Sequence, residues 1–518
     1  MKLPSLRQIV EELKRILVRF PLVMTAAITG TIAALVLIEQ EGPAKPTLFL
    51  PLLLTSMVGF FLLLGLSMLA EKRNWSSPLR FAAQGGALLL LLVYGFSLPT
   101  LIDNEPAVHI VRFLMLMVAA LLFALVVPFA GTREENGFWH YAKAIVIRFL
   151  TAAFYAGVLQ IGLSLALLAL NQLFDISIPD ERYGELWVLL VGLFGTSFFL
   201  AGMPEDLNAL ETKSDYPKGL KIFAQNILSA VMLVYLVILY AYLAKIILAW
   251  SWPRGWVSGL ILGFSATGIV ALLLLWPIRS REENRWGHLV WRWFFVVLIP
   301  LVVMLFLAVW RRISEYGLTF SRSLGLAAAL FLALLILYFL LGKSRNIKVI
   351  PGLLGIMALL LSFGPWSLFS VSEKSQKERL ETLLTRNGLL AGGTIQKAAR
   401  EVPDQDALQI SSIISYLHEM HGYGAIQSWF REPLVAEKEG KQLRLKPDEL
   451  AGMLGVEYLR GPRGGSGPER SLNAKREGSI DIAGYDRMVT GLFAGEDGEL
   501  SGLEGTELTC TASNGLER

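Results

Sequence analysis

Apolar residues form long uninterrupted runs up to Phe369, and only short interrupted ones after it. The runs approach or exceed the ~20 residues that an α-helix needs to cross the hydrocarbon core of a bilayer. The pattern predicts an all-α polytopic membrane helix bundle over residues 21–369 and a small α+β extracytoplasmic domain over residues 370–518. We expect about eleven spans: Pro21–Ile38, Thr47–Ala70, Phe81–Ile102, Ala107–Ala130, Ala144–Leu170, Leu186–Met203, Gly219–Leu248, Val257–Trp276, Leu289–Trp310, Leu324–Leu341 and Val349–Phe369.

The first 20 residues differ from a cleaved signal peptide, because they lack an apolar central region and a small-residue cleavage site. Their apolar positions repeat with helical spacing, while Lys14, Arg15 and Arg19 fall elsewhere on the helix. We therefore expect residues 1–20 to form an amphipathic interfacial helix that ends at Pro21. The apolar positions are Leu6, Ile9, Val10, Leu13, Ile16, Leu17 and Phe20.

Composition and motifs limit the kinds of reaction and cofactor that the chain can support. The chain is 54% hydrophobic and 17% charged, against about 25% charged in soluble domains. The single cysteine, Cys510, excludes an internal disulfide and a cysteine-rich metal cluster. The stretch "GPRGGSG" lacks the GK[ST] ending of a phosphate-binding loop, and HExxH, GxSxG and paired acidic residues within a span are all missing. We expect no cofactor, no metal and no nucleic-acid partner, and we favour a non-enzymatic role.

Lys and Arg residues are distributed unequally between the two sides of the predicted bundle. With the N-terminus inside, inner segments hold 21 basic residues and outer segments hold 8. Because cytoplasmic loops carry the excess of Lys and Arg, this bias predicts a cytoplasmic N-terminus. An odd number of spans then places the C-terminal domain outside, whereas an even number would reverse that side.

The stretch "YAYLAKIILAWSWPRGWVSG" ends the seventh predicted span with a lysine and three tryptophans. Lys245 lies near the outer end, where its stem can follow the helix while the ammonium reaches the headgroups, and tryptophans suit the same interface. We favour this anchoring interpretation. The alternative is that Lys245 points into the bundle and pairs there, because ionisable groups within a membrane are often functional.

Small residues recur every four positions after these tryptophans, at Gly255, Gly259, Gly263 and Thr267. Such a stripe lets another helix approach closely, so we expect it to pack against a helix. A substrate groove is the less favoured alternative.

Arg311, Arg312 and Arg322 lie on the predicted outer side, where Lys and Arg should be depleted. Three explanations compete: the topology is wrong here, the arginines are interfacial anchors beside Trp310, or they form an outer anion site together with Lys245 and Arg254. Such a site would bind an anionic headgroup, a phosphate or an acidic protein surface. The charge balance supports it, since residues 370–518 carry 18 basic and 23 acidic groups (−5) and the preceding part carries 29 and 20 (+9).

The C-terminal part contains candidate helices followed by shorter elements. "SEKSQKERLETLLTRNGLL" predicts a charged helix with Ser375 and Glu378 at capping-box spacing. A second helix is expected over residues 404–421, and "GAIQSWF" begins a third. Beyond Glu432 we expect short strands and turns, a flexible linker over residues 461–470 and a strand in "GSIDIAGYD". His418 and His421 have the spacing of a metal pair, but lacking further ligands they fit a surface or capping role better.

Stretches in both parts resemble a bacterial multi-pass membrane family catalogued as domain of unknown function 4153. They are "LYAYLAKIILAWSWPRGWVS", "VWRRISEYGLTFSR", "FGPWSLFSVSEKSQKERLETLL", "ISSIISYLHEMHGYGAIQSWF" and "IDIAGYD". The resemblance covers most of the chain and implies a bacterial envelope protein with a membrane helix bundle and an attached soluble domain; we expect it in the cytoplasmic (inner) membrane. It implies no particular activity. The tail after "GYD" is short for this family, which leaves the completeness of the soluble domain open.

We therefore expect an integral membrane protein that binds or senses an envelope component through its outer domain and its basic–aromatic outer rim. Its partners would be the lipid bilayer, an anionic lipid or envelope component, and membrane or periplasmic proteins. The main alternative is a transporter or flippase of an anionic or lipidic substrate, and a lipid-linked transferase ranks third. Substrate-dependent flux in proteoliposomes would favour transport, whereas binding by the outer domain without flux would favour sensing.

Overall fold

The structure is a computed structural model that describes residues 6–40, 47–100, 106–249, 257–279, 285–342, 346–396, 402–438, 441–459, 493–494 and 500–501. Contacts divide the chain into two units, Met1–Pro468 and Glu469–Arg518. The second unit contains one described hairpin, β5 (Phe493–Ala494) with β6 (Leu500–Ser501). The predicted linker and the "GSIDIAGYD" strand lie outside the described residues.

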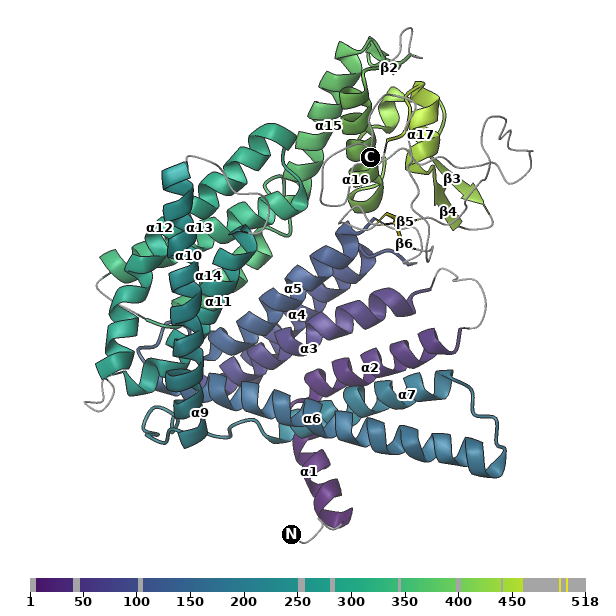
Figure 1. Ribbon diagram of the computed structural model, residues 1–518. Helices are drawn as coiled ribbons and strands as arrows, with labels where there is room; N and C mark the ends of the chain where they lie inside the picture. The colour runs from purple at the N-terminus through teal and green to yellow at the C-terminus, as the bar shows by residue number, and fades with distance from the viewer. Residues whose placement is uncertain are drawn as a thin grey trace. The chain divides into compact units, whose positions relative to one another are not determined.

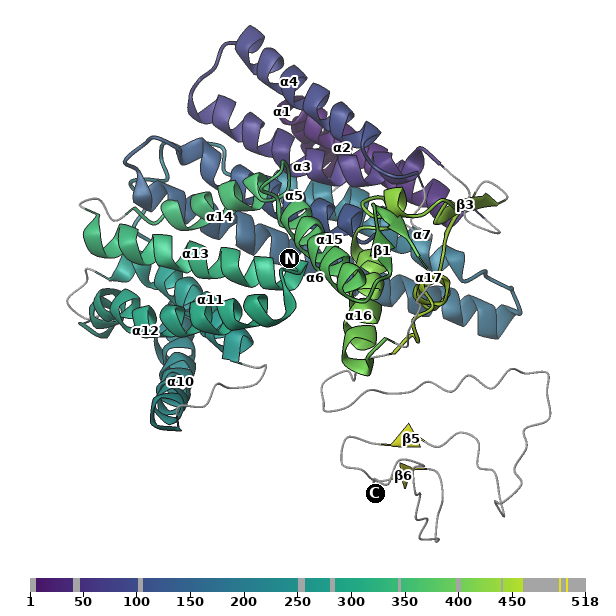
Figure 2. The same cartoon turned by 90° about the horizontal axis from the view of Figure 1, so that it is seen from above.

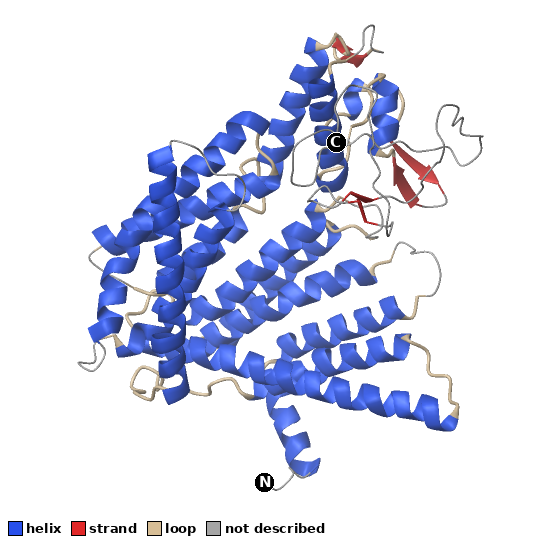
Figure 3. Ribbon diagram, viewed as in Figure 1, coloured by secondary structure: helices blue, strands red, loops and turns tan. Residues whose placement is uncertain are grey.

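Helices dominate the first unit, and every described strand of this unit follows α15 in the chain (Figures 1 and 3). Its first half contains α1 (Leu6–Arg19), α2 (Pro21–Ile38), α3 (Phe49–Lys72), α4 (Ser77–Phe96), α5 (Val108–Val126) with η1 (Val127–Phe129), α6 (Glu135–Phe174) and α7 (Glu181–Leu189), which continues through the π-helix η2 (Leu190–Gly195) into α8 (Thr196–Ala201).

The second half of the bundle contains α9 (Lys218–Ile222), the π-helix η3 (Phe223–Leu228), α10 (Ser229–Ala249), α11 (Val257–Leu275) with η4 (Trp276–Ile278), α12 (Arg285–Tyr316), α13 (Phe320–Leu341) and α14 (Val349–Leu360). Helices α12 and α13 lie side by side (Figure 2). Each pair of helices joined by a π segment corresponds to one predicted span.

Among the described residues, ten helical segments are long and apolar enough to cross a membrane. Large apolar side chains on them stay uncovered by protein, such as Phe96 at 87%, Leu173 at 75% and Leu248 at 86% exposure. Side chains of this kind in water would oppose folding, whereas a lipid environment accommodates them. The chain is therefore a multi-pass membrane protein with an all-α bundle, as the sequence predicted.

The eleventh predicted span is a shorter helix than expected, because α14 has only 12 residues. Its flanks nevertheless reach both ends of α5. Lys348 Nζ donates to the carbonyl oxygens of Phe129 at 3.1 Å and Thr132 at 2.7 Å, while Arg112 Nε donates to Ser362 O at 3.2 Å. Residues 348–362 thus run antiparallel to α5 over most of its length. The chain then turns at Gly364, whose φ of +84° favours glycine, before α15 begins.

One end of the bundle, which we call the N-terminal face, is crossed by the loop over residues 202–217. Arg19 of α1 makes a bidentate ion pair with Glu71 at 2.8 and 3.0 Å, and it also donates to the carbonyl oxygens of Met203 and Pro204. The buried Lys72 pairs with Glu134 and donates to Asn208 Oδ1 at 2.7 Å. These contacts hold α1 and the loop against the ends of α3 and α6.

A separate apolar core lies within residues 380–459 of the same unit, and we call residues 368–459 the α15–α17 domain. It contains α15 (Leu368–Arg386), the hairpin β1 (Leu390–Ala391) with β2 (Thr394–Ile395), α16 (Asp404–Met420), η6 (Gln427–Trp429), the antiparallel pair β3 (Val435–Lys438) with β4 (Lys441–Arg444), and α17 (Pro447–Leu454). Whether residue 370 is a domain boundary stays a prediction.

Three details of this domain differ from the sequence prediction. Helix α15 begins earlier than the predicted capping box, since Ser367 Oγ caps it by accepting from Ser370 N at 3.1 Å. The expected third helix is only the three-residue turn η6, where the Gln427 side chain binds the backbone of Glu432 and Leu434. Helix α17 was not predicted, although Pro447 at its first position and a Glu449 carboxylate capping its N-terminus are helix-start signals.

Candidate functional site at the bundle–domain junction

The turn between α12 and α13 is bound directly by the α15–α17 domain. Ser375 Oγ accepts from Leu318 N at 3.0 Å, and Tyr416 Oη accepts from Phe320 N at 2.8 Å. The side-chain amide of Gln376, only 2% exposed, donates to Tyr316 O at 3.2 Å and Leu318 O at 2.9 Å. We call these contacts the junction, because three side chains of the domain satisfy backbone groups of a turn between two bundle helices.

Gly317 makes this close contact possible. Its φ of +69° lies in the left-handed region, and a Cβ at this position would be 2.9 Å from Gln376 Nε2. Phe320 also stacks on Phe369 at the start of α15, with 5.3 Å between ring centroids. The conformation of the turn thus fits α15 closely, and we expect a movement of α15 to be transmitted to α12 and α13.

A second set of contacts joins the domain to α5. Ala107 N donates to Glu419 O at 2.8 Å. Arg112 lies over the rings of Phe363 and Phe369, at 5.7 and 5.1 Å from their centroids. Nearby, His421 Nε2 lies 3.1 Å from Ser372 Oγ and 3.2 Å from Tyr416 Oη. Burial, and to a lesser degree the positive charge of Arg112, lower the pKa of His421 to about 4, so its imidazole is neutral at pH 7.

Two of the predicted outer cations already have partners within the chain. Arg322 donates to Tyr316 O at 3.0 Å and Gly317 O at 2.9 Å, so it stabilises the α12–α13 turn. Arg311 is exposed and pairs with Glu315 at 3.0 Å. Arg312 is half-buried and makes no hydrogen bond or ion pair with a described residue. Among the three described arginines of this group, it is therefore the one best placed to meet a ligand.

The remaining predicted positions lie on α10, on α11 and between them. Lys245 is exposed on α10, and Arg254 and Gly255 fall outside the described residues. Gly259 and Gly263 are exposed on α11, and no atom of another described residue lies within 4 Å of a Cβ built at either one. Helix packing on the stripe that ends at Thr267 stays a prediction, and within the described chain no helix covers these two glycines.

His418 and His421 face different surroundings, although they lie three residues apart, His418 in the last turn of α16 and His421 directly after it. The ring of His418 lies against Tyr423 at 5.5 Å, whereas that of His421 lies against Tyr416 at 5.4 Å. In the part of the chain that the structure describes, no three His, Cys, Asp or Glu side chains gather closely enough to hold a metal ion. The two histidines instead belong to the packing of the domain and of the junction.

Sequence reasoning missed Arg112, Gln376 and Tyr416. An available signal was the position of Arg112, five residues into an apolar helix, because a charge at that depth needs a partner. Gln376 and Tyr416 carried no such signal, since polar residues on a charged helix are ordinarily solvated.

The sequence model of a family described as "Domain of unknown function (DUF4153)" matches residues 58–387, well over half of the chain. The chain belongs to the DUF4153 family. The DUF4153 match extends from α3 to the end of α15, so it includes the α12–α13 turn and the part of α15 that binds it.

A curated relative, "Uncharacterized protein PM1469" of Pasteurella multocida (strain Pm70), is 24% identical over 349 residues. The alignment covers 67% of this chain and 57% of that protein. This chain therefore spans less than two thirds of the relative's length. No solved structure matches the chain significantly.

Proposed function

We propose that this chain is a multi-pass protein of the bacterial cytoplasmic membrane that binds or senses an anionic envelope component. The α15–α17 domain and the basic–aromatic rim beside it would meet that component outside the cytoplasm, and the junction would pass the event to the bundle. The observation that carries this proposal is the binding of the α12–α13 turn by Ser375, Gln376 and Tyr416. A domain that serves only as a tethered cap has no need of side chains that bind a turn between two spans.

The orientation is supported by charge. Basic residues are concentrated in the segments that the sequence places with the N-terminus, which the positive-inside rule assigns to the cytoplasm. The contacts of Lys348 and Arg112 place the two ends of the eleventh predicted span at opposite ends of α5. Eleven crossings would carry the α15–α17 domain to the side opposite the N-terminus.

The chemistry of the rim favours an anionic ligand. A guanidinium presents up to five N–H donors in a fork that matches carboxylate and phosphate groups. Arg312 makes no hydrogen bond or ion pair with a described residue, and it lies one turn from the α12–α13 turn. Binding at Arg312 would therefore act on the same turn that the domain holds.

The test uses the full chain in nanodiscs, with Cys510→Ser and an environment-sensitive dye on Ser314→Cys. Lipopolysaccharide and soluble peptidoglycan fragments serve as two anionic probes, and thermophoresis measures their binding separately from the dye response. We expect Arg312→Glu to weaken binding, while Arg133→Glu leaves it unchanged. Arg133 is a matched control, because it is an exposed arginine of the N-terminal face without a hydrogen bond or ion pair to a described residue.

A second variant tests the coupling. Gln376→Leu should keep the binding seen by thermophoresis but lose the dye response, because the turn is then released from α15. If neither probe binds, the sensing proposal is wrong. Probe-dependent flux in proteoliposomes would replace it with transport of an anionic substrate.

A further inference from the structure

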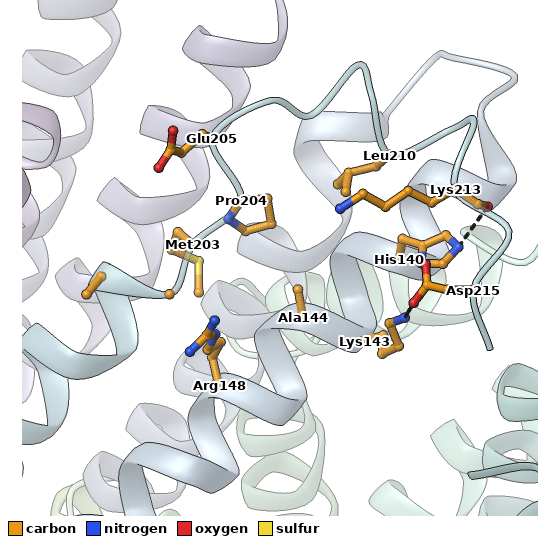
Figure 4. Close-up of a pocket in the computed structure, with 12 residues that line it drawn as sticks. His140, Lys143, Ala144, Arg148, Met203, Pro204, Glu205, Leu210, Lys213 and Asp215 are labelled. Atoms are coloured by element: carbon orange, nitrogen blue, oxygen red, sulfur yellow. Dashed lines mark hydrogen bonds and ion pairs between the residues drawn. The ribbon is translucent and has the colours of Figure 1, made fainter. Parts of the chain in front are cut away.

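A cavity of about 470 Å³ opens at the N-terminal face, between α6 and the 202–217 loop. This volume lies within the range of small-molecule sites, roughly 300–1,000 Å³. Its walls are the α6 residues His140, Lys143 and Arg148, together with residues 201–205 and the loop residues Leu210, Lys213 and Asp215 (Figure 4). Most of its charged side chains are cationic.

Both acidic groups of the cavity are already engaged. Asp215 Oδ2 accepts from Lys143 Nζ at 3.1 Å, and this ion pair lowers the pKa of the Asp215 carboxyl. Its other oxygen lies 3.9 Å from His140 Nδ1. Glu205 pairs with Arg15 of α1. Neither carboxylate is therefore available to neutralise a further cation in the cavity.

Two cations remain without a counter-charge. Arg148 and the side chain of Lys213 make no hydrogen bond or ion pair with any residue that the structure describes. Figure 4 shows the ammonium of Lys213 directed toward Pro204 and Leu210, and the guanidinium of Arg148 directed toward Met203. Both cations line the same cavity, so an anion that enters it would meet positive charge from α6 and from the loop.

Gly202 fixes the position of Arg148. A Cβ at residue 202 would lie only 2.2 Å from Arg148 Cδ and 2.4 Å from its Nε. The aliphatic part of the Arg148 side chain thus packs on the backbone of residue 202, where only glycine leaves room. This contact places the guanidinium at the wall of the cavity. This arrangement limits the conformations that a ligand would have to select.

The surroundings indicate an amphiphilic ligand. Directly beside Arg148 on α6, the apolar residues Ile147, Phe149 and Leu150 are 47%, 54% and 60% exposed, as expected for side chains in lipid. On the other side the cavity meets the loop that carries Lys213. A phosphate held here could keep acyl chains on the apolar surface of α6.

We propose that this cavity binds a phosphate group, with Arg148 and Lys213 as its main ligands, and that the phosphate belongs to a phospholipid headgroup. Arginine forks and lysine ammonium groups are the standard protein partners of phosphate oxygens. The proposal concerns the face opposite the junction and does not depend on the function proposed for the α15–α17 domain.

The test is isothermal titration calorimetry on the full chain in a non-ionic maltoside. The probes are dihexanoyl phosphatidic acid, inorganic phosphate and dihexanoyl glycerol, which lacks the phosphate. We expect phosphatidic acid to bind, and Arg148→Gln/Lys213→Gln to weaken that binding at least about tenfold, since charge-assisted hydrogen bonds are lost. Arg133→Gln/Lys218→Gln is the matched control: it removes two exposed charges near the same face that do not line the cavity, and it should bind like the unmodified chain.

The other outcomes separate the sources of the phosphate. Binding of phosphatidic acid that is much tighter than binding of inorganic phosphate supports a lipid. Equal binding supports a phosphate site but overturns the lipid assignment. Equal affinity of the unmodified chain and of Arg148→Gln/Lys213→Gln overturns the site. Arg148→Lys, which keeps the charge, should retain most of the affinity and shows whether a loss reflects charge rather than misfolding.

Discussion

Replacing Gln376 with leucine should release the α12–α13 turn from α15 while leaving both elements folded. The Gln376 side chain is 2% exposed, and its amide donates to Tyr316 O and Leu318 O. Leucine has a similar size but no donor. Leu318 O then loses its hydrogen-bond donor, whereas Tyr316 O loses one of two donors and keeps the hydrogen bond from Arg322. The unsatisfied Leu318 oxygen destabilises the bound state by about 1–2 kcal/mol and the hydrogen bond lost at Tyr316 by about 1 kcal/mol, which gives about 2–3 kcal/mol in total for the junction.

Hydrogen exchange measures this change at the turn itself. The amides of Leu318 and Phe320 donate to Ser375 and Tyr416 across the junction. They should therefore exchange through local opening of the junction. Because 1.4 kcal/mol corresponds to a factor of ten, a loss of about 2–3 kcal/mol should accelerate their exchange by about 30- to 150-fold.

Glu378→Gln is the matched control, because this carboxylate lies two residues further along α15 and is 63% exposed. It should leave the exchange of Leu318 and Phe320 unchanged. If Gln376→Leu folds and these amides still exchange at the original rate, the junction is not held by the Gln376 hydrogen bonds, and the reasoning is refuted.

Two further substitutions and one pH titration test the α12–α13 turn, the N-terminal face and His421. Gly317→Ala should loosen the same turn by about 1–3 kcal/mol, because its φ is +69° and the added Cβ would meet a side chain of α15; exchange at the turn measures it. Lys72→Met should leave a carboxylate and an amide oxygen of the N-terminal face without their cation, lowering the melting temperature and making residues 203–211 more sensitive to protease. For His421, the pKa of about 4 lies below the unfolded value of 6.5, so the unfolded chain binds the proton more tightly. Stability should be complete above pH 6.5 and fall toward pH 4, by about 1–2 kcal/mol after allowing for partial exposure of the ring. Melting temperatures measured across this window, with His421→Asn lacking this decrease, check the expectation; equal pH dependence in both proteins would contradict it.

The bundle could be predicted from the sequence because each helix that crosses lipid needs a long continuous stretch of apolar residues. The N-terminal helix Leu6–Arg19 and the helix at Asp404–Met420 were likewise visible as local patterns. The last predicted span was only partly visible, because its apolar run continues past the point where the helix ends. Gly364-Pro365 marks the turn, yet the composition before it gives no sign that the helix stops at Leu360.

The junction and the cavity could not be predicted, because each depends on residues that folding brings together. Arg322 appeared as an outer cation, but its donors are used by the backbone of the turn that precedes it. Lys213 comes near Arg148 only because the 202–217 loop folds back over α6. Periodicity describes which face of one helix is apolar, and it contains no information about which loop covers that helix.

The proposed function requires that the α15–α17 domain and the α12–α13 turn lie outside the cytoplasm and that the N-terminal face lies inside. We would measure this orientation with a membrane-impermeant maleimide on intact spheroplasts, using single cysteines in a Cys510→Ser background. The positions are Ser314 beside the turn, Lys374 on α15, with 77% of its side chain exposed, and Thr212 in the exposed loop of the N-terminal face. We expect labelling at 314 and 374, and labelling at 212 only after the membrane is permeabilised. Labelling of intact spheroplasts at 212 but not at 314 and 374 would show that the orientation is the reverse.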